Sequence, residues 1–163
     1  MLIAYRILTY LLIPLALILG LLALVAFMAA AANITALLPA FLCGATVIYI
    51  FTSLSFLQKG VLAHQPCKAS LYDWIKVNGF VTLFMGSLFV FQSIYFRGNT
   101  ELAEQMQSQM DAMADEIKTK DVPEVQQLIE WVINFMLVTG VLLLTHVLLG
   151  FQMLKKYAGV FKV

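Results

Sequence analysis

No charged side chain occurs in the 52 residues from 7 to 58, between Arg6 and Lys59. At a rise of about 1.5 Å per residue, a helix of that length would extend roughly 78 Å. The hydrocarbon core of a bilayer is only about 30 Å thick. The run is therefore too long for one membrane crossing and long enough for two.

The break between these two crossings is predicted at the sequence Ala32-Asn33-Ile34-Thr35. Thr35 is the predicted N-cap of the second helix, which places Pro39 in the first helical turn, where a missing N–H is tolerated. We expect crossings at about 7–31 and 36–58. The first apolar stretch exceeds 20 residues, against about 7–15 for the core of a signal peptide, so we expect it to be a retained crossing.

Two further apolar stretches follow. Tyr72 and Trp74 suit the headgroup level at the start of a third crossing, expected at about 72–96. Trp131 and the pair Lys155-Lys156 bound a fourth, at about 131–154. The chain is 62% hydrophobic, with a mean hydropathy of +0.92, against about 45–50% apolar residues in soluble domains. We expect residues 1–163 to form a single all-α integral membrane domain with four transmembrane helices.

The segment from Arg97 to Glu130 is the only long hydrophilic stretch. It carries eight of the nine acidic residues: Glu101, Glu104, Asp111, Asp115, Glu116, Asp121, Glu124 and Glu130. Apolar side chains recur in it at helical spacing, which predicts an extra amphipathic helix at about 99–121, between the third and fourth crossings. We predict that its apolar row binds a partner protein: Leu102, Met106, Met110, Met113 and Ile117. Thioethers could also bind Cu(I), but the same row is explained by burial of an apolar face.

The basic residues favour one orientation in the membrane. Seven lie on one predicted side: Arg6, Lys59, Lys68, Lys76, Lys155, Lys156 and Lys162. Three lie on the other: Arg97, Lys118 and Lys120. The positive-inside rule then places both termini in the cytoplasm and residues 97–130 in the periplasm or outside the cell. We expect the membrane to be a bacterial inner membrane.

His146 is the only histidine predicted inside a crossing, and no Asp, Glu, Lys or Arg is predicted as deep. Such a residue is a functional hypothesis by default. Counting residues from the membrane boundary brings Thr82, Tyr49 and Thr52 to a similar depth, together with residues 10–14 of the first crossing. We expect a polar intramembrane cluster, which would serve either as a site or as a hydrogen-bonded link between helices. Haem would need a second histidine, and His64 lies in a loop.

Small and amide side chains indicate how the helices associate. Gly79, Gly86 and Ser93 recur every seven residues and predict close approach of another helix. Gln92 and Asn134 are expected at matching depth on the third and fourth crossings, where they could bond to each other.

Several function classes lack support in the sequence. Basic residues are too few and scattered for a nucleic-acid surface, and Cys43 and Cys67 form neither a CxxC pair nor a zinc pattern. We expect no enzyme activity, no cofactor and no metal. The leading hypothesis is a non-catalytic subunit or interaction protein of a larger membrane assembly, bound to other membrane proteins or to itself. The alternative is a small oligomeric carrier or channel for an apolar or amphipathic solute, using a polar layer around His146; a lipid- or quinone-directed enzyme comes third.

Overall fold

The computed structural model describes residues 1–99, 108 and 122–162. Within these residues, four helices are long and apolar enough to cross a membrane: Leu2–Ala30, Ile34–Leu62, Ala69–Gly98 and Glu130–Lys156. The all-α class is therefore confirmed. The extra amphipathic helix expected at 99–121, with its row Leu102, Met106, Met110, Met113 and Ile117, lies outside the described residues apart from Asn99 and Ser108.

The chain forms two compact units. Unit 1 comprises Met1–Gly86 and Leu142–Val163, and unit 2 comprises Ser87–Val141. Helices α3 (Ala69–Gly98) and α5 (Val122–Lys156) are each divided between the two units. The remaining elements belong to unit 1, which also holds the sites described below.

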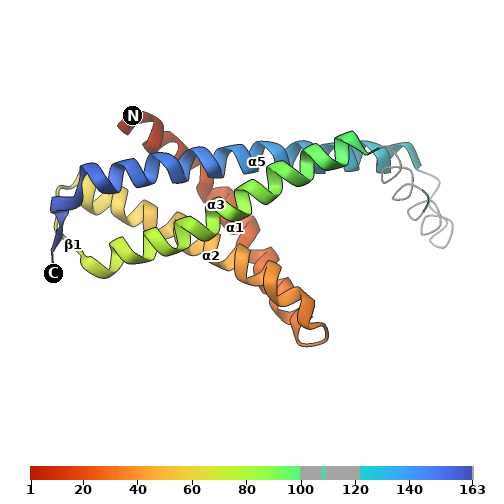
Figure 1. The fold of residues 1–163 in the computed structure, drawn as a ribbon, viewed down its shortest axis with the longest axis horizontal. Coiled ribbons are helices and arrows are strands. Elements are labelled where there is room, and N and C mark those ends of the chain that lie inside the picture. The colour runs from red at the N-terminus through yellow and green to blue at the C-terminus, as the bar shows by residue number, and fades with distance from the viewer. Residues whose placement is uncertain (100–107, 109–121, 163) are drawn as a thin grey trace. The chain divides into compact units, whose positions relative to one another are not determined.

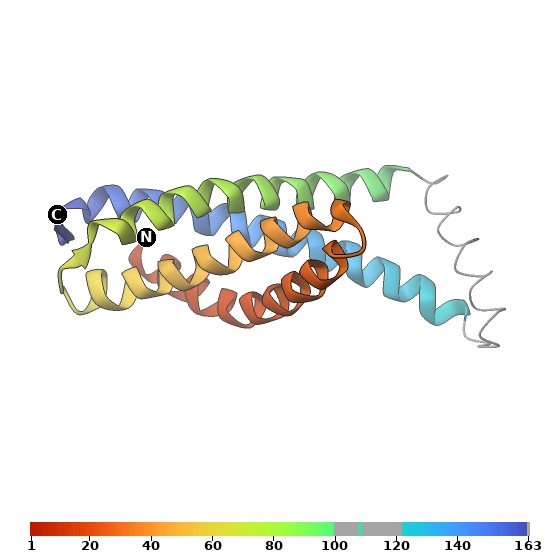
Figure 2. The ribbon, with the colours of Figure 1, turned by 90° about the horizontal axis from the view of Figure 1, so that it is seen from below.

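Unit 1 is built on an antiparallel helical hairpin. Helix α1 (Leu2–Ala30) and helix α2 (Leu37–Ser55) run side by side, joined by the short helix η1 (Ile34–Ala36) (Figure 1, Figure 2). The side chain of Asn33 caps the turn, its Oδ1 accepting from the Thr35 backbone N–H at 3.0 Å. The predicted cap at Thr35 was wrong: Asn33 is extended, with φ −141° and ψ 108°, whereas Thr35 already lies inside η1.

The other end of α2 widens into a π-helix, η2 (Phe56–Leu62). Short single-turn π-segments occur often near functional sites. After it the chain reverses at His64, whose φ is 51°, and enters β1 (Cys67–Lys68). A one-turn helix, η3 (Ala158–Val160), leads from α5 to β2 (Phe161–Lys162). Strands β1 and β2 pair in parallel, with Cys67 opposite Phe161.

Aromatic packing and glycine close this end of unit 1. The Phe161 ring stacks on Phe56 at a centroid distance of 5.3 Å, and Tyr72 meets it edge-on at 5.3 Å. A Cβ at Gly60 would lie 3.1 Å from the Sγ of Cys67, so glycine at this position favours the close approach of η2 to β1. The C-terminal strand is thereby fixed to the loop between α2 and α3.

Unit 2 contains the second part of α3 and the first part of α5. The guanidinium of Arg97 donates a hydrogen bond to the Oδ1 of Asn134, which ties the two helices together. Asn134 was predicted to pair with Gln92, and that was wrong: Gln92 is exposed, and the longer Arg97 side chain reaches the amide instead.

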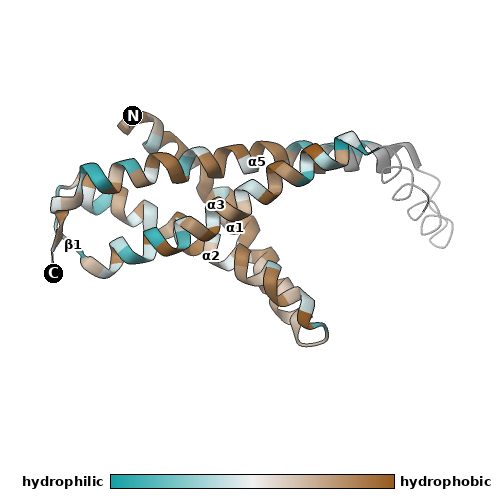
Figure 3. Ribbon diagram, viewed as in Figure 1, coloured by the Kyte–Doolittle hydropathy of each residue, from teal (hydrophilic) through white to brown (hydrophobic). Residues whose placement is uncertain are grey.

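The hydrophobic core of unit 1 is small for the apolar content of its helices. Its largest fully buried side chains include Tyr5, Leu12, Tyr49, Phe56 and Leu57. Only 22% of the most apolar window of α1 is buried within the protein, and 33% of that of the helix Ile34–Leu62. Figure 3 shows that α1 and α2 are coloured as hydrophobic along most of their length.

Candidate functional site

The side chain of His146 lies in α5 and is fully buried, with 0% of its surface exposed. Its Nε2 is 2.9 Å from the Oγ1 of Thr9 on α1, and its Nδ1 is 3.1 Å from the phenol oxygen of Tyr49 on α2. The ring of Tyr5 stacks on the imidazole at 5.0 Å with an interplanar angle of 13°. His146 thus joins three helices at one point.

The hydroxyls of Thr9 and Tyr49 each have an acceptor besides the imidazole ring. The Oγ1 of Thr9 lies 2.7 Å from the backbone oxygen of Tyr5, and the Tyr49 hydroxyl lies 3.3 Å from the His146 carbonyl oxygen. A neutral imidazole donates through one nitrogen and accepts through the other, so both tautomers fit this geometry. In either tautomer, both ring nitrogens have a hydrogen-bond partner.

The network extends to a fifth side chain. The Tyr5 hydroxyl is 2.5 Å from the Oγ of Ser53 on α2. We call Tyr5, Thr9, Tyr49, Ser53 and His146 the His146 cluster; every member is 0% exposed. Burial of polar groups without partners would cost several kcal/mol, about 2–7, so full pairing is what makes this layer tolerable between apolar helices.

Glycines make the close approach of these helices possible. A Cβ at Gly150, one turn beyond His146, would lie 2.8 Å from the Tyr49 hydroxyl. A Cβ at Gly79 on α3 would lie 2.8 Å from the Phe151 ring and 3.3 Å from Tyr49. The close helix contact expected at Gly79 is therefore present, and Tyr49 is held between the two glycines.

The four residues predicted to form the polar layer separate into two groups. The structure brings His146 and Tyr49 together. The hydroxyl of Thr82 instead donates to Asn78 O at 2.8 Å, in its own helix, and that of Thr52 donates to Ile48 O at 2.7 Å in α2. Tyr5, Thr9 and Ser53 were not predicted. Their spacing could have indicated them, because Tyr5 and Thr9, like Tyr49 and Ser53, are four residues apart and share one face of an otherwise apolar helix.

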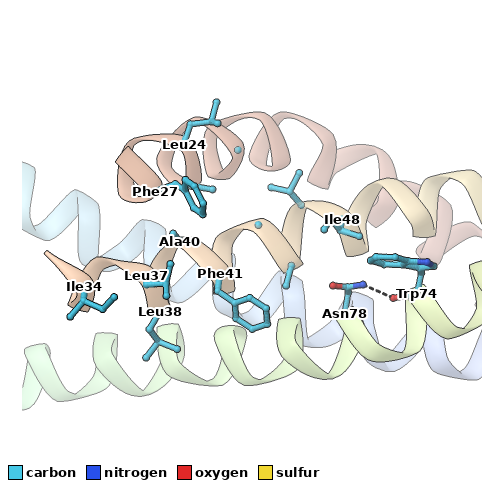
Figure 4. A pocket seen from close by; sticks show the side chains of 15 residues that line it. Leu24, Phe27, Ile34, Leu37, Leu38, Ala40, Phe41, Ile48, Trp74 and Asn78 are labelled. Carbon is cyan, nitrogen blue, oxygen red and sulfur yellow. Dashed lines mark hydrogen bonds between the residues drawn. The ribbon is translucent and has the colours of Figure 1, made fainter. Parts of the chain in front are cut away.

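A groove lies beside this cluster, between α1, α2 and the start of α3. It has a volume of about 960 Å³, and apolar side chains such as Leu24, Phe27 and Phe41 line it (Figure 4). Asn78 brings a polar group to the lining. We call this cavity the α1–α2 groove.

Cys67 lies in β1, outside the long helices of unit 1. It is 5% exposed, and burial raises the pKa of its thiol above the ordinary value, an effect that the charge of nearby Lys59 partly offsets. A thiol with a raised pKa is a weak nucleophile at neutral pH. Within the described residues, His, Cys, Asp and Glu form no group of three that could hold a metal ion.

Comparison with protein-family models, with curated proteins and with solved structures finds no match for the chain.

Proposed function

We propose that the chain is an integral membrane protein whose four long helices cross a bilayer, and that it acts as a non-catalytic interaction subunit of a larger membrane assembly. The observation that carries this proposal is the exposure of the apolar helix surface. Large side chains at helical spacing along α1 are 60–78% exposed: Leu17, Leu21, Val25 and Met28. Exposing such an apolar stripe to water is unfavourable, so we expect lipid or a partner helix to cover it.

The distribution of lysines supports an orientation with both termini in the cytoplasm of a bacterial cell. Lys59, Lys68, Lys76, Lys155 and Lys156 are all exposed. They lie on η2, β1, the start of α3 and the end of α5, where Figure 3 shows hydrophilic residues gathered around β1. The positive-inside rule assigns this end of unit 1 to the cytoplasm.

The state of His146 favours an interaction protein over a carrier. A carrier that used this side chain would need an open path to it. Both ring nitrogens are instead hydrogen-bonded within the protein, and the ring is fully buried. The His146 cluster therefore suits a structural link that holds α1, α2 and α5 together. The outer faces of these helices remain free to contact lipid or a partner protein.

The orientation is tested by labelling single cysteines with a membrane-impermeant maleimide in intact cells. The background is Cys43→Ala/Cys67→Ala, with either Ser108→Cys or Lys68→Cys added, since both positions are exposed. Cysteine at 108 should react in intact cells, and cysteine at 68 only after lysis. Labelling of position 68 in intact cells would reverse the proposed orientation.

The interaction itself is tested by photo-crosslinking in living cells. A photoreactive amino acid is placed in turn at Leu17, Leu21, Val25 and Met28, with the buried Leu12 and Leu19 as matched controls on the same helix. A partner would give a protein adduct of one size at neighbouring stripe positions and none at the controls. Lipid adducts alone at every stripe position, with a monomer in native mass spectrometry, would contradict the proposal.

A further inference from the structure

The α1–α2 groove is apolar along its length and polar at one end. On η1 and α2 together its lining extends from Ile34 to Ile48, which at about 1.5 Å per residue is roughly 21 Å. Trp74 and Asn78 of α3 also line the groove. One leaflet of hydrocarbon is about 15 Å thick, half the bilayer core. The groove is therefore long enough for an extended acyl chain.

Asn78 supplies an acceptor that the protein does not use. Its side chain is 7% exposed, and its Nδ2 donates to the Trp74 backbone oxygen at 2.9 Å. In Figure 4 the amide oxygen points away from this bond, toward the groove. Within the described residues no donor reaches that oxygen, and no fully buried side-chain N or O atom lacks a partner. The oxygen must accordingly be open to the groove.

We propose that the α1–α2 groove binds a long-chain lipid with a free hydroxyl at its polar end, the acyl chain lying along α1 and α2 and the hydroxyl donating to Asn78 Oδ1. This rests only on the membrane residence proposed above, and needs no protein partner. The occupant must bring a hydrogen-bond donor because the unused group is an acceptor, and a lipid hydroxyl supplies one. Phosphatidylcholine carries only acceptors in its ester and phosphate groups, and a transmembrane helix has its backbone donors already bonded internally.

The width of the groove is set by a small residue on α2. A Cβ added at Gly44 would meet no atom within 4 Å, and Gly44 lines the groove. Space next to this position is therefore open to an acyl chain, and a large side chain there would extend into the groove.

The test uses the fluorescence of Trp74, which lines the groove. The Trp131→Phe variant leaves Trp74 as the only tryptophan, since the chain has two. The protein is placed in phosphatidylcholine nanodiscs, and a monoacylglycerol with a brominated acyl chain is added as quencher. The matched control lipid is its di-O-methyl ether, which has the same chain and no hydroxyl proton. We expect half-maximal quenching at about three- to tenfold lower mole fraction for the hydroxyl lipid, the effect of one hydrogen bond in a membrane.

Two variants separate the hydrogen bond from the groove. Asn78→Leu keeps the volume and removes the acceptor, so both lipids should then quench equally, at the mole fraction of the ether. Gly44→Phe should remove saturable quenching by either lipid and leave only the linear quenching by bulk lipid. Equal quenching by the two lipids in the Trp131→Phe protein, or saturable quenching that persists in Gly44→Phe, would overturn the proposal. Failure of the protein to enter nanodiscs would instead count against membrane residence.

Discussion

Replacing Gly150 by alanine places a methyl group against the hydroxyl of Tyr49. The new Cβ would lie 2.8 Å from that oxygen, whereas its contacts with Tyr5 Cε2 at 3.7 Å and Tyr49 Cζ at 3.9 Å are ordinary. A relaxed C···O contact is about 3.3 Å or more, so the hydroxyl must move by about half an ångström. Its bond to His146 Nδ1 is already 3.1 Å and has little room to lengthen.

The expected loss in free energy of unfolding follows from the hydrogen bonds of the Tyr49 hydroxyl that the added methyl group would break. The Tyr49 hydroxyl lies within bonding distance of Nδ1 and of the His146 carbonyl oxygen. A side-chain hydrogen bond in a membrane protein contributes about 0.6 kcal/mol on average and up to about 1.7 kcal/mol. Loss of both lowers the free energy of unfolding by about 1–3 kcal/mol. Gly→Ala itself favours the helix by about 1 kcal/mol, so the proper reference is Gly44→Ala, which has open space.

Tyr49→Phe provides the decisive second change, because it removes the oxygen that the methyl group would strike. Alone it leaves His146 Nδ1 without its hydrogen-bond partner and costs about 1–3 kcal/mol. Once the oxygen is gone, Gly150→Ala should add no further loss, so the double variant should be more stable than the sum of the single effects by about 1 kcal/mol or more.

The assay is reversible unfolding in mixed micelles with rising SDS, followed by circular dichroism on the four variants and the parent. The reasoning is refuted if Gly150→Ala is as stable as Gly44→Ala. It is equally refuted if the effects of Tyr49→Phe and Gly150→Ala are additive.

Three further predictions concern unit 1. Gly79→Ala should destabilise less than Gly150→Ala in the same titration, because its closest contact is the half-buried Phe151 ring, which can turn aside; Phe151→Leu should restore most of the loss, and no rescue would count against this contact. His64→Gly should raise the free energy of unfolding by up to about 1 kcal/mol, since φ is 51° there, while Gln65→Gly should lower it; the opposite order would exclude strain at His64. Maleimide should label Cys67 in a Cys43→Ala background more slowly at pH 7.5 than the exposed thiol of Cys43→Ala/Cys67→Ser/Lys68→Cys, because burial raises the pKa of Cys67. Equal labelling rates for the two thiols would contradict the raised pKa. Because the folded protein holds the Cys67 proton more tightly than the unfolded chain, the protonated thiol contributes stability that is complete below the ordinary thiol pKa. That contribution is lost as the pH rises through the raised pKa.

The helices themselves could be predicted from sequence, because charge-free length and hydropathy decide which segments suit a bilayer. Their ends could not. The residues from 7 to 58 predict a hairpin, but the cap at Asn33 depends on its extended backbone, which composition does not encode. The π-helix at Phe56–Leu62 was not predicted either; within it Gly60 lies close to Cys67 of β1, a contact between segments that a local sequence pattern does not encode.

The His146 cluster was only partly predictable. Depth along the membrane normal correctly brings Tyr49 to His146, yet on the first helix it points to residues 10–14 rather than to Tyr5 and Thr9. Depth arithmetic ignores tilt and rotation, and a shift of one residue turns a side chain by about 100° around the helix. The partners of a buried polar group are set by that rotation.

Thr9 and His146 are separated by 137 positions, so the link between α1 and α5 cannot form until 137 further residues have been synthesised after Thr9. At about 5–20 residues per second, the first helix waits roughly 7–27 s for its last partner. Tyr5 meets Ser53 much earlier, 48 residues on. The α1–α2 hairpin therefore assembles first, with Thr9 and Tyr49 still lacking His146. A nascent chain that has not yet reached α5 carries an incomplete polar layer between α1 and α2.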